Sequence, residues 1–252
     1  MGVSFVTGAA SGIGAEIARR LAGSGPVCLL DRNLAGAVEV ASAIASAGGE
    51  ALALEGDVGN SADLARAVHA AVSRFGRLDV AVASAGVDTY GGFLTASEVD
   101  WDRVMTVNAK GVFLTAQATL PSLIETGAGR FIAIASDAGL VGCPGFSVYC
   151  ASKHAVIGLV RSLACEFGGR GLRANCVCPA FVETPMSAAF AANASGPEAE
   201  YWHGVVPLKR FALPSEIAGV VDYLASPAAS YVNGVAYAVD GGATAELHRS
   251  AA

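Results

Sequence analysis

The chain has 252 residues, of which 53% are hydrophobic and only 15% are charged, and its formal net charge is −6. A chain of this length forms one large domain or two small ones, and the composition is too apolar for a disordered protein. Because the sequence contains no run of lysine or arginine, neither nucleic acid nor an anionic membrane is expected as a partner.

Cysteine usage and the length of the apolar runs indicate the cellular compartment in which the protein is expected. The six cysteines form no Cys-x-x-Cys motif, and no histidine stands at metal-ligand spacing. We therefore expect buried, reduced thiols and no metal site. The sequence shows no secretory signal at its start and no apolar run long enough to span a bilayer. Together these features predict a cytoplasmic protein.

Short apolar runs alternate with longer helical patterns along the chain. Strands are expected at Val3–Val6, Val27–Asp31, Ala51–Glu55, Leu78–Ser84, Arg130–Ser136, Leu172–Cys178 and Val235–Val239. Helices are expected at Gly12–Ser24, Leu34–Ala47, Ser61–Phe75, Glu98–Glu125, Cys150–Phe167 and Pro214–Ala225. The strands are almost continuously apolar, which is typical of a sheet that is covered on both faces.

This alternation predicts the fold class. Strands separated by helices form βαβ units with right-handed crossovers, so the strands run parallel in one sheet. We predict a single α/β domain over residues 1–252, a Rossmann-type, doubly wound, seven-stranded parallel sheet with helices on both faces. The segment 184–211 interrupts the alternation with small and aromatic residues, and it is predicted to form a substrate lid.

A glycine-rich turn joins the first expected strand to the first expected helix. Its glycines allow the backbone to turn sharply and to approach a pyrophosphate, while the helix N-terminus offers N–H groups to the phosphates. The spacing differs from the usual Gly-x-Gly-x-x-Gly, so the signal depends on its strand–turn–helix context. The cofactor-binding residues expected in this turn are Gly8, Ser11, Gly12, Ile13 and Gly14.

Asp31 ends the second expected strand, about twenty residues beyond the turn. A carboxylate there can accept hydrogen bonds from the adenosine ribose, and its charge repels the additional phosphate of NADP. Arg32 follows at once and could pair with that phosphate, but we give it less weight because the carboxylate is fixed in the ribose pocket. NAD is therefore the expected cofactor. The alternative is that Asp31 is only a turn residue at the end of a strand.

Tyr149 and Lys153 stand four residues apart near the start of an expected helix, and therefore on one helix face. An ammonium beside a phenol stabilises the phenolate, and an oxidised nicotinamide ring adds to this, so the pKa of Tyr149 is expected to fall below about 10. Such a tyrosine can act as a general base toward an alcohol or a general acid toward a ketone. An isolated pair of this kind is common on helix surfaces and would carry little weight alone.

Two further polar residues strengthen this interpretation. Ser136 closes an apolar strand at its carboxyl end, where doubly wound sheets bind ligands, and the glycine-containing loop after it can return the chain to Tyr149. Its hydroxyl can hydrogen-bond a substrate oxygen as charge develops on it. Asn108 lies within a long helical pattern that asparagine does not favour, which indicates either a functional site or a buried capping role.

In combination these residues resemble the short-chain dehydrogenase/reductase family, of the short, single-domain kind. The resemblance covers residues 2–242 and rests on Thr7-Gly8-x-x-x-Gly12-Ile13-Gly14, Asp57-Val58, Ala85-Gly86, Asn108, Ser136, Tyr149-x-x-x-Lys153 and Asp240-Gly241-Gly242. It implies a catalytic tetrad of Asn108, Ser136, Tyr149 and Lys153. In that tetrad Tyr149 would be the acid/base and Ser136 would orient the substrate oxygen. Lys153 would lower the pKa of Tyr149 and hold the nicotinamide ribose, and Asn108 would hold a water of a proton relay.

The same resemblance implies the rest of the cofactor site. Asp57 and Val58 would hold the adenine, Ala85 and Gly86 would line the adenosine ribose, and Pro179, Val182 and Thr184 would hold the nicotinamide. The chain departs from the family pattern at two places. It has Ala83 and Ser84 where two asparagines are usual, so Ser84 is expected to supply only part of their hydrogen bonds, and it has Ala180 where a glycine is usual.

By family position, the expected substrate pocket contains Asp137, Leu140, Val141, Cys143, Phe146, Phe181, Met186, Phe190 and Trp202. Most of these are apolar, which favours an alicyclic, aromatic or otherwise bulky secondary alcohol or its ketone. Asp137 either binds a polar substrate group or is a turn residue at the end of a strand.

The predicted function is an NAD-dependent alcohol dehydrogenase or ketoreductase. An NADPH-dependent reductase and a non-catalytic dinucleotide sensor on the same fold are the alternatives, because fold alone does not choose among them. The expected helices Glu98–Glu125 and Cys150–Phe167 carry more apolar residues than one buried stripe needs. Together with the family resemblance, this excess predicts a homotetramer or a homodimer.

Overall fold

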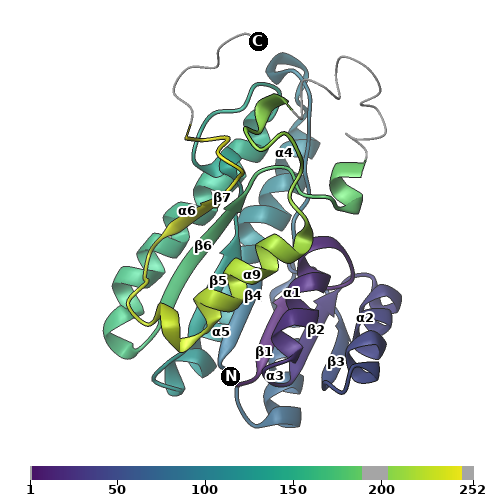
Figure 1. The fold of residues 1–252 in the computed structure, drawn as a ribbon, viewed down its shortest axis with the longest axis vertical. Helices are drawn as coiled ribbons and strands as arrows, with labels where there is room; N and C mark the ends of the chain where they lie inside the picture. The colour runs from purple at the N-terminus through teal and green to yellow at the C-terminus, as the bar shows by residue number, and fades with distance from the viewer. Residues whose placement is uncertain (1, 189–203, 246–252) are drawn as a thin grey trace.

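The fold is known from a computed structural model that describes residues 2–188 and 204–245. Seven parallel strands form one sheet in the order β3-β2-β1-β4-β5-β6-β7 (Figure 1). Their bounds are β1 Ser4–Thr7, β2 Val27–Asp31, β3 Ala51–Glu55, β4 Val80–Ala83, β5 Arg130–Ile134, β6 Arg173–Pro179 and β7 Ala236–Val239. The strand order reverses direction between β1 and β4, so the predicted doubly wound sheet is confirmed.

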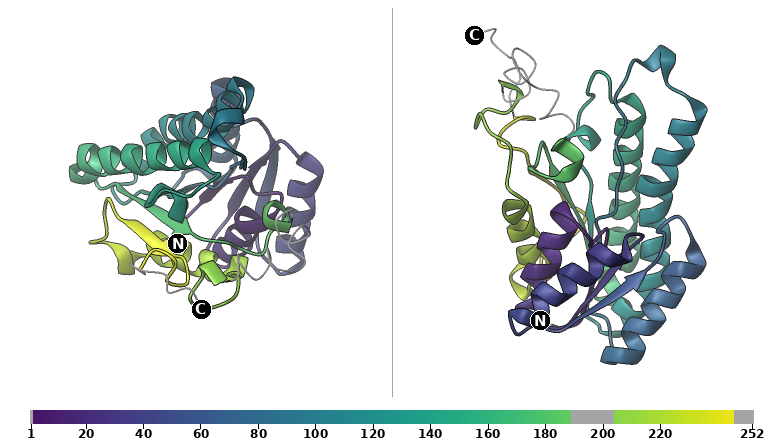
Figure 2. Two further views of the ribbon diagram at one scale, coloured as in Figure 1. Left: turned by 90° about the horizontal axis from the view of Figure 1, so that it is seen from above. Right: turned by 90° about the vertical axis from the view of Figure 1, so that its right-hand side faces the viewer.

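Helices cover both faces of the sheet, as Figure 2 shows. One face carries α1 Gly12–Ala22, α2 Leu34–Ser46 and α9 Pro214–Ala225, with α1 packed between the other two. The other carries α3 Ser61–Phe75, α5 Gly111–Glu125 and α6 Ser147–Phe167, with α4 Glu98–Val104 beside α6. Short 3-10 turns lie at Phe93–Thr95, Asp137–Gly139, Gly168–Arg170 and Pro227–Ala229.

The buried core is divided by the sheet into two layers. Successive strand residues point to opposite faces, so neighbours along a strand enter different layers. Phe5 and Phe131 pack with residues of α3, α5 and α6, whereas Val6 and Ile132 pack with residues of α1, α2 and α9. All four side chains are almost completely buried, which explains why the strands read as continuous apolar runs.

The expected elements agree with these bounds to within three residues at either end, with one exception. The expected helix Glu98–Glu125 is instead α4 and α5 joined by the π-helical turn Met105–Lys110. Asn108 lies inside this turn. Widened turns of this kind are rare and are frequently found at functional sites. The poor helix propensity of Asn108 therefore marked a real change in the helix.

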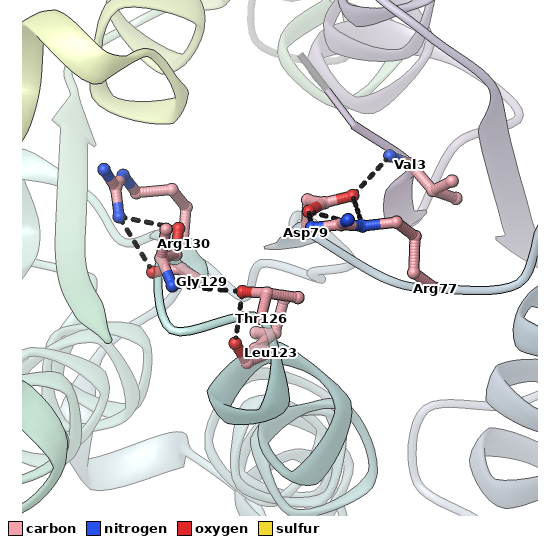
Figure 3. A network of polar contacts seen from close by, with 8 residues as sticks. Val3, Arg77, Asp79, Leu123, Thr126, Gly129 and Arg130 are labelled. Atoms are coloured by element: carbon pink, nitrogen blue, oxygen red, sulfur yellow. Dashed lines mark hydrogen bonds and ion pairs between the residues drawn. The ribbon is translucent and has the colours of Figure 1, made fainter. Parts of the chain in front are cut away.

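At the amino-terminal edge of the sheet, Asp79 ties β1 to β4 (Figure 3). Its Oδ2 atom accepts a hydrogen bond from the backbone N–H of Val3 at 2.9 Å, and both carboxylate oxygens accept bonds from Nε of Arg77. Arg130, also drawn there, donates to the carbonyl of Gly129 at 3.2 Å. These contacts lie at the edge opposite the carboxyl ends of the strands, and the bond between Val3 and Asp79 is the one that links two strands.

All six cysteines are free thiols. Cys28, Cys150, Cys176 and Cys178 are buried, whereas Cys143 is half-buried and Cys165 is exposed, so the expectation of buried thiols fits four of the six. Across residues 2–188 and 204–245, no helix has both the length and the hydropathy needed to cross a membrane.

Candidate active site

The glycine-rich turn lies at the carboxyl edge of the sheet, between β1 and α1, and lines a cavity of about 270 Å³. Gly8 and Gly12 have φ angles of 66° and 54°, in the region that favours glycine. A Cβ atom on Gly14 would lie 2.1 Å from the carbonyl oxygen of Gly8. The turn therefore needs glycine at these positions, which lets the backbone itself form the wall of the cavity.

The start of α1 offers hydrogen-bond donors to this cavity. Ser11 is the N-cap residue, and its side chain makes no capping hydrogen bond. The first turn of a helix has backbone N–H groups without partners inside the helix, and the helix dipole adds positive potential there. Ser11, Gly12, Ile13 and Gly14 all line the cavity, so this wall suits a pyrophosphate.

Asp31 ends β2 and lies in the same cavity. Its Oδ2 atom accepts a hydrogen bond from the N–H of Ala10 at 3.0 Å, and its Oδ1 atom accepts one from the N–H of Asn33 at 2.9 Å. The carboxylate thus holds the glycine-rich turn and its own turn in place. Arg32, which is exposed, lies 3.9 Å from the carboxylate of Asp57, and both line the cavity with Val58.

The loop after β4 closes the cavity on the side of β1. The hydroxyl of Thr7 accepts hydrogen bonds from the N–H groups of Ser84 at 3.1 Å and Ala85 at 3.3 Å. Ser84, Ala85 and Gly86 line the cavity next to the turn. Ala83 and Ser84 occupy the positions of the two asparagines that are usual in the family. Here Thr7 holds the loop through the backbone N–H groups of Ser84 and Ala85, and the side chain of Ala83 adds no hydrogen bond.

A second cavity, of about 410 Å³, brings Ser136, Tyr149 and Lys153 together. It shares lining residues with the first cavity, so the two adjoin. The shared residues are Ile13, Ser84, Gly86, Val87, Thr184 and Met186. A dinucleotide that places its phosphates on α1 can therefore extend from the first cavity into the second.

Lys153 is buried beneath the second cavity and takes part in two contacts. Its ammonium donates a hydrogen bond to the carbonyl oxygen of Ile134 at 2.9 Å, at the end of β5, and its Nζ atom lies 5.5 Å from the centroid of the Tyr149 ring. Burial lowers the pKa of Lys153 to about 8. The ammonium is still the main form at neutral pH, and its position is fixed by the edge of the sheet.

Tyr149 is half-buried in the first turn of α6. Burial raises the pKa of its phenol above the ordinary value, the hydrogen bond with Ser136 lowers it, and the carboxylates of Asp137 and Asp88 raise it further. The direction is opposite to the one expected from the Tyr-Lys spacing, because removal from water disfavours the phenolate. In the protein without cofactor, the neutral phenol is therefore the stable form.

Ser136 stands at the carboxyl end of β5, at the base of a 3-10 turn. Its hydroxyl donates a hydrogen bond to Oδ1 of Asp137 at 2.9 Å and accepts one from the N–H of Ala138 at 3.2 Å. Since Ser136 also lowers the pKa of Tyr149 through a hydrogen bond, its oxygen lies between the phenol and a carboxylate. Serine and tyrosine hydroxyls can together hold one substrate oxygen.

Asn108 is completely buried and all its hydrogen bonds are local to the site. Its Oδ1 atom accepts from the N–H of Val87 at 2.9 Å, and its amide donates to the carbonyl of Val87 at 2.8 Å and to the hydroxyl of Ser152 at 3.0 Å. The π-helical turn thereby connects the loop after β4 to the residue next to Lys153. These hydrogen bonds to Val87 and Ser152 explain why an asparagine stands at this point of the helix.

Six of the nine expected pocket residues line the second cavity: Asp137, Val141, Cys143, Phe146, Phe181 and Met186. Leu140 does not; it packs against the core beside α6, because the 3-10 turn directs it inward. Phe190 and Trp202 lie outside the described residues, as does the middle of the segment 184–211 predicted to be a lid.

The segment after β6 forms another wall of the second cavity, with Pro179, Ala180, Val182 and Thr184 among its lining residues. Ala180 replaces a usual glycine without strain, because Lys209 is the one non-glycine residue with a positive φ in the described part of the chain. Thr184 also lines the first cavity, so this segment lies where the two cavities meet.

Sequence reasoning missed several residues of the second cavity, of which Asp88 matters most. Its position, directly after Ala85-Gly86-Val87 at the carboxyl end of β4, is a signal that could have found it. Val205 and Thr244 also line this cavity, and their distance in sequence from the other motifs hid them. No cluster of metal-ligating side chains occurs within the ranges that the structure describes.

Comparison with known proteins places the chain among related enzymes. The family model described as Enoyl-(Acyl carrier protein) reductase matches residues 8–244. The D-threitol dehydrogenase of Mycolicibacterium smegmatis is 38% identical over 243 residues, which cover 96% of this chain and 92% of that one. The 2-(S)-hydroxypropyl-CoM dehydrogenase 3 of Xanthobacter autotrophicus is 37% identical, with 96% of each chain covered.

A solved structure resembles that of this protein over nearly the whole chain. It is a candidate NAD(P)-dependent gluconate 5-dehydrogenase from Beutenbergia cavernae, with NADP bound at low occupancy. The two structures superpose with a TM-score of 0.90 at 36% sequence identity, covering 97% of each chain.

Proposed function

Because the chain belongs to the short-chain dehydrogenase/reductase family, we propose that it is an NAD-dependent oxidoreductase that interconverts a secondary alcohol and its ketone. The observation that carries the proposal is the pair of adjoining cavities. One has a glycine-lined wall at a helix N-terminus, and the other contains Ser136, Tyr149 and Lys153. Dehydrogenases among the relatives support the same reaction class.

The first cavity suits a nicotinamide dinucleotide. The backbone of the glycine-rich turn and the start of α1 would hold the pyrophosphate. Asp31 would accept hydrogen bonds from the adenosine ribose, and Asp57 and Val58 would contact the adenine. When bound, the nicotinamide supplies or accepts the hydride. Pro179, Val182 and Thr184 would hold that ring at the junction of the cavities.

Tyr149 is the acid/base of the proposed reaction. In ketone reduction the neutral phenol donates a proton to the substrate oxygen, which suits the raised pKa of Tyr149. In alcohol oxidation the tyrosine must first lose its proton, and Lys153 holds a positive charge beside the ring to favour that form. Ser136 hydrogen-bonds the substrate oxygen, and Asn108 would hold a water of the proton relay.

The substrate is proposed to be mostly apolar. Val141, Phe146, Phe181 and Met186 contribute apolar walls to the second cavity, which suits an alicyclic, aromatic or otherwise bulky body. The second cavity has a volume of about 410 Å³, which suits a small molecule of this kind, and its substrate would lie beside the bound nicotinamide.

NADPH is the second candidate cofactor, since the Beutenbergia relative binds NADP. Arg32 would be the residue to receive the additional phosphate, because it lines the first cavity. We prefer NAD because the carboxylate of Asp31 is held by two backbone N–H groups in that cavity.

We further propose a homotetramer, or a homodimer, in the cytoplasm. Phe93 and Leu94 lie in the first 3-10 turn, Val99 and Trp101 in α4, and Phe113 on α5, all with exposed side chains. Large apolar side chains exposed on these elements favour contact with a second copy. Free thiols, four of them buried, are compatible with a reducing compartment.

A panel of secondary alcohols with NAD and of ketones with NADH tests the reaction class. The wild-type protein is expected to turn over members of the panel, and Tyr149→Phe is expected to lose turnover while NADH binding stays measurable. Tyr223→Phe, an exposed tyrosine on α9, is the matched control. Cofactor binding without turnover across both panels would instead indicate a dinucleotide sensor.

A further inference from the structure

We propose that the second cavity selects a secondary alcohol, or its ketone, that carries a protonated amine on the carbon next to the reacting one. Asp88 and Asp137 would bind the ammonium, and the apolar wall would hold the rest of the molecule. This inference rests on the proposed function and names the substrate class of the same site.

The two carboxylates reach the cavity from different strands. Asp88 follows β4 and Asp137 follows β5, which are neighbours in the sheet, and both line the cavity that contains Tyr149. Lys153 is the one further charged side chain that lines this cavity within the described part of the chain. Its ammonium is already bonded to the carbonyl of Ile134, whereas Asp88 and Asp137 bring two carboxylates to the same cavity.

Asp137 lies within one hydrogen bond of the catalytic hydroxyl. Its Oδ1 atom accepts a hydrogen bond from Ser136 at 2.9 Å, and Ser136 is the residue that would hold the substrate oxygen. A donor on the carbon next to the reacting carbon would therefore come close to this carboxylate. An ammonium has three N–H donors, so it can bond a carboxylate while the alcohol oxygen stays with Ser136.

Asp88 is half-buried, and its charge is not balanced by a close ion pair in the part of the chain that is described. Arg103 is the nearby cation, but it donates to the backbone carbonyl of Asp88 at 3.0 Å and pairs with Asp100 at 3.4 Å. Burial raises the pKa of Asp88, because a carboxylate that is removed from water is costly. A substrate ammonium would compensate this cost.

The same charge also favours the chemistry. Asp137 and Asp88 both raise the pKa of Tyr149, so they oppose the phenolate that alcohol oxidation needs. An ammonium bound between them would offset this effect. A neutral hydroxyl could bond the carboxylates but would not offset their charge, and a carboxylate substrate would be repelled.

The proposed step is balanced with the cofactor already named. The hydrogen on the carbinol carbon leaves as hydride to the oxidised nicotinamide, and the hydroxyl proton goes to Tyr149. The products are an amino ketone and reduced cofactor, while the ammonium itself is unchanged. Val141, Phe146 and Phe181 would contact the substituent on the other side of the reacting carbon.

The test uses four phenyl carbinols that differ only in the group on the neighbouring carbon, which is ammonium, hydroxyl, methyl or carboxylate. Near neutral pH, kcat/KM is expected to be about tenfold or more higher for the ammonium compound than for the methyl compound, as a charge-assisted hydrogen bond allows. The carboxylate compound is expected to be the poorest substrate. Equal or better turnover of the methyl or carboxylate compound would overturn the proposal.

Variants assign the preference to the two carboxylates. Asp88→Asn and Asp137→Asn are each expected to reduce the ammonium-to-methyl ratio of kcat/KM by about tenfold. A general loss of activity, caused by the contact between Asp137 and Ser136, lowers kcat/KM for both compounds and therefore cancels in the ammonium-to-methyl ratio. Asp102→Asn, the same change at an exposed position of α4, is expected to keep the wild-type ratio. An unchanged ratio in both pocket variants would also overturn the proposal.

Failure of the proposed function can be told apart from failure of this inference. If none of the four carbinols is turned over, calorimetric binding of the same compounds to the NADH complex still measures the charge preference. Tighter binding of the ammonium compound than of the methyl compound supports the inference, and equal binding overturns it. Turnover without a charge preference supports the reaction class alone.

Discussion

Replacement of Asp31 by asparagine tests the assignment of the first cavity to NAD. The carboxylate accepts two backbone N–H groups, from Ala10 at 3.0 Å and Asn33 at 2.9 Å. Asparagine has one acceptor oxygen, so one of these N–H groups loses its partner at a cost of about 1–3 kcal/mol. This loss loosens the glycine-rich turn and weakens the binding of both cofactors, so the ratio of the two affinities is the informative quantity.

The charge changes that ratio. A carboxylate and a unit charge about 5 Å apart repel by about 1–3 kcal/mol for effective dielectric constants of about 80 to 20. Removing this repulsion should shift the NADPH-to-NADH affinity ratio toward NADPH by about five- to a hundredfold.

Fluorescence titration of NADH and NADPH measures both dissociation constants without a known substrate. Asp102→Asn serves as the control for loss of a carboxylate elsewhere. If Asp31→Asn weakens both cofactors equally, so that their ratio stays at the wild-type value, Asp31 does not discriminate between them and the reasoning is refuted.

Three further outcomes follow from the structure. Because the pKa of Tyr149 is raised and oxidation needs the phenolate, the rate of alcohol oxidation should increase with pH through the alkaline range. Asp137→Asn removes a charge that raises this pKa, so it should move the increase to lower pH. A shift of the profile to higher pH would contradict this reasoning. Gly14→Ala should abolish cofactor binding in the same titration, since its Cβ would lie 2.1 Å from the carbonyl of Gly8, whereas Gly219→Ala, with open space around it, should bind normally. Asp79→Asn should lower stability by about 1–3 kcal/mol in thermal denaturation while cofactor affinity stays unchanged, because it acts at the opposite edge of the sheet; retained melting temperature would show that its bonds to Val3 and Arg77 are not stabilising.

Most of the fold could be predicted from the sequence because both faces of the sheet are covered. Such strands read as short apolar runs, and their order in the chain with intervening helices specifies the parallel topology. The same logic placed Asp31 and Ser136 at the carboxyl edge, and the structure brings Ser136, Tyr149 and Lys153 into one cavity. The catalytic roles of these residues stay predictions.

The features that escaped prediction depend on contacts between distant segments. Nothing local to Asn108 shows that its side chain bonds Val87, or that the helix widens there. The raised pKa of Tyr149 follows from burial and from the charge of Asp88, and neither can be inferred from the spacing between Tyr149 and Lys153. Leu140 was assigned to the pocket by its position in the family pattern, but the turn after Ser136 directs it into the core.

Transfer of a labelled hydride tests the central claim most directly. A secondary alcohol that the protein oxidises is prepared with deuterium on the carbinol carbon, and the reduced cofactor is analysed by mass spectrometry. The wild-type protein is expected to place the deuterium in NADH, and Tyr149→Phe to do so about a hundred- to ten-thousandfold more slowly with cofactor still bound. Unlabelled NADH, or label transfer at the wild-type rate by Tyr149→Phe, would contradict the account.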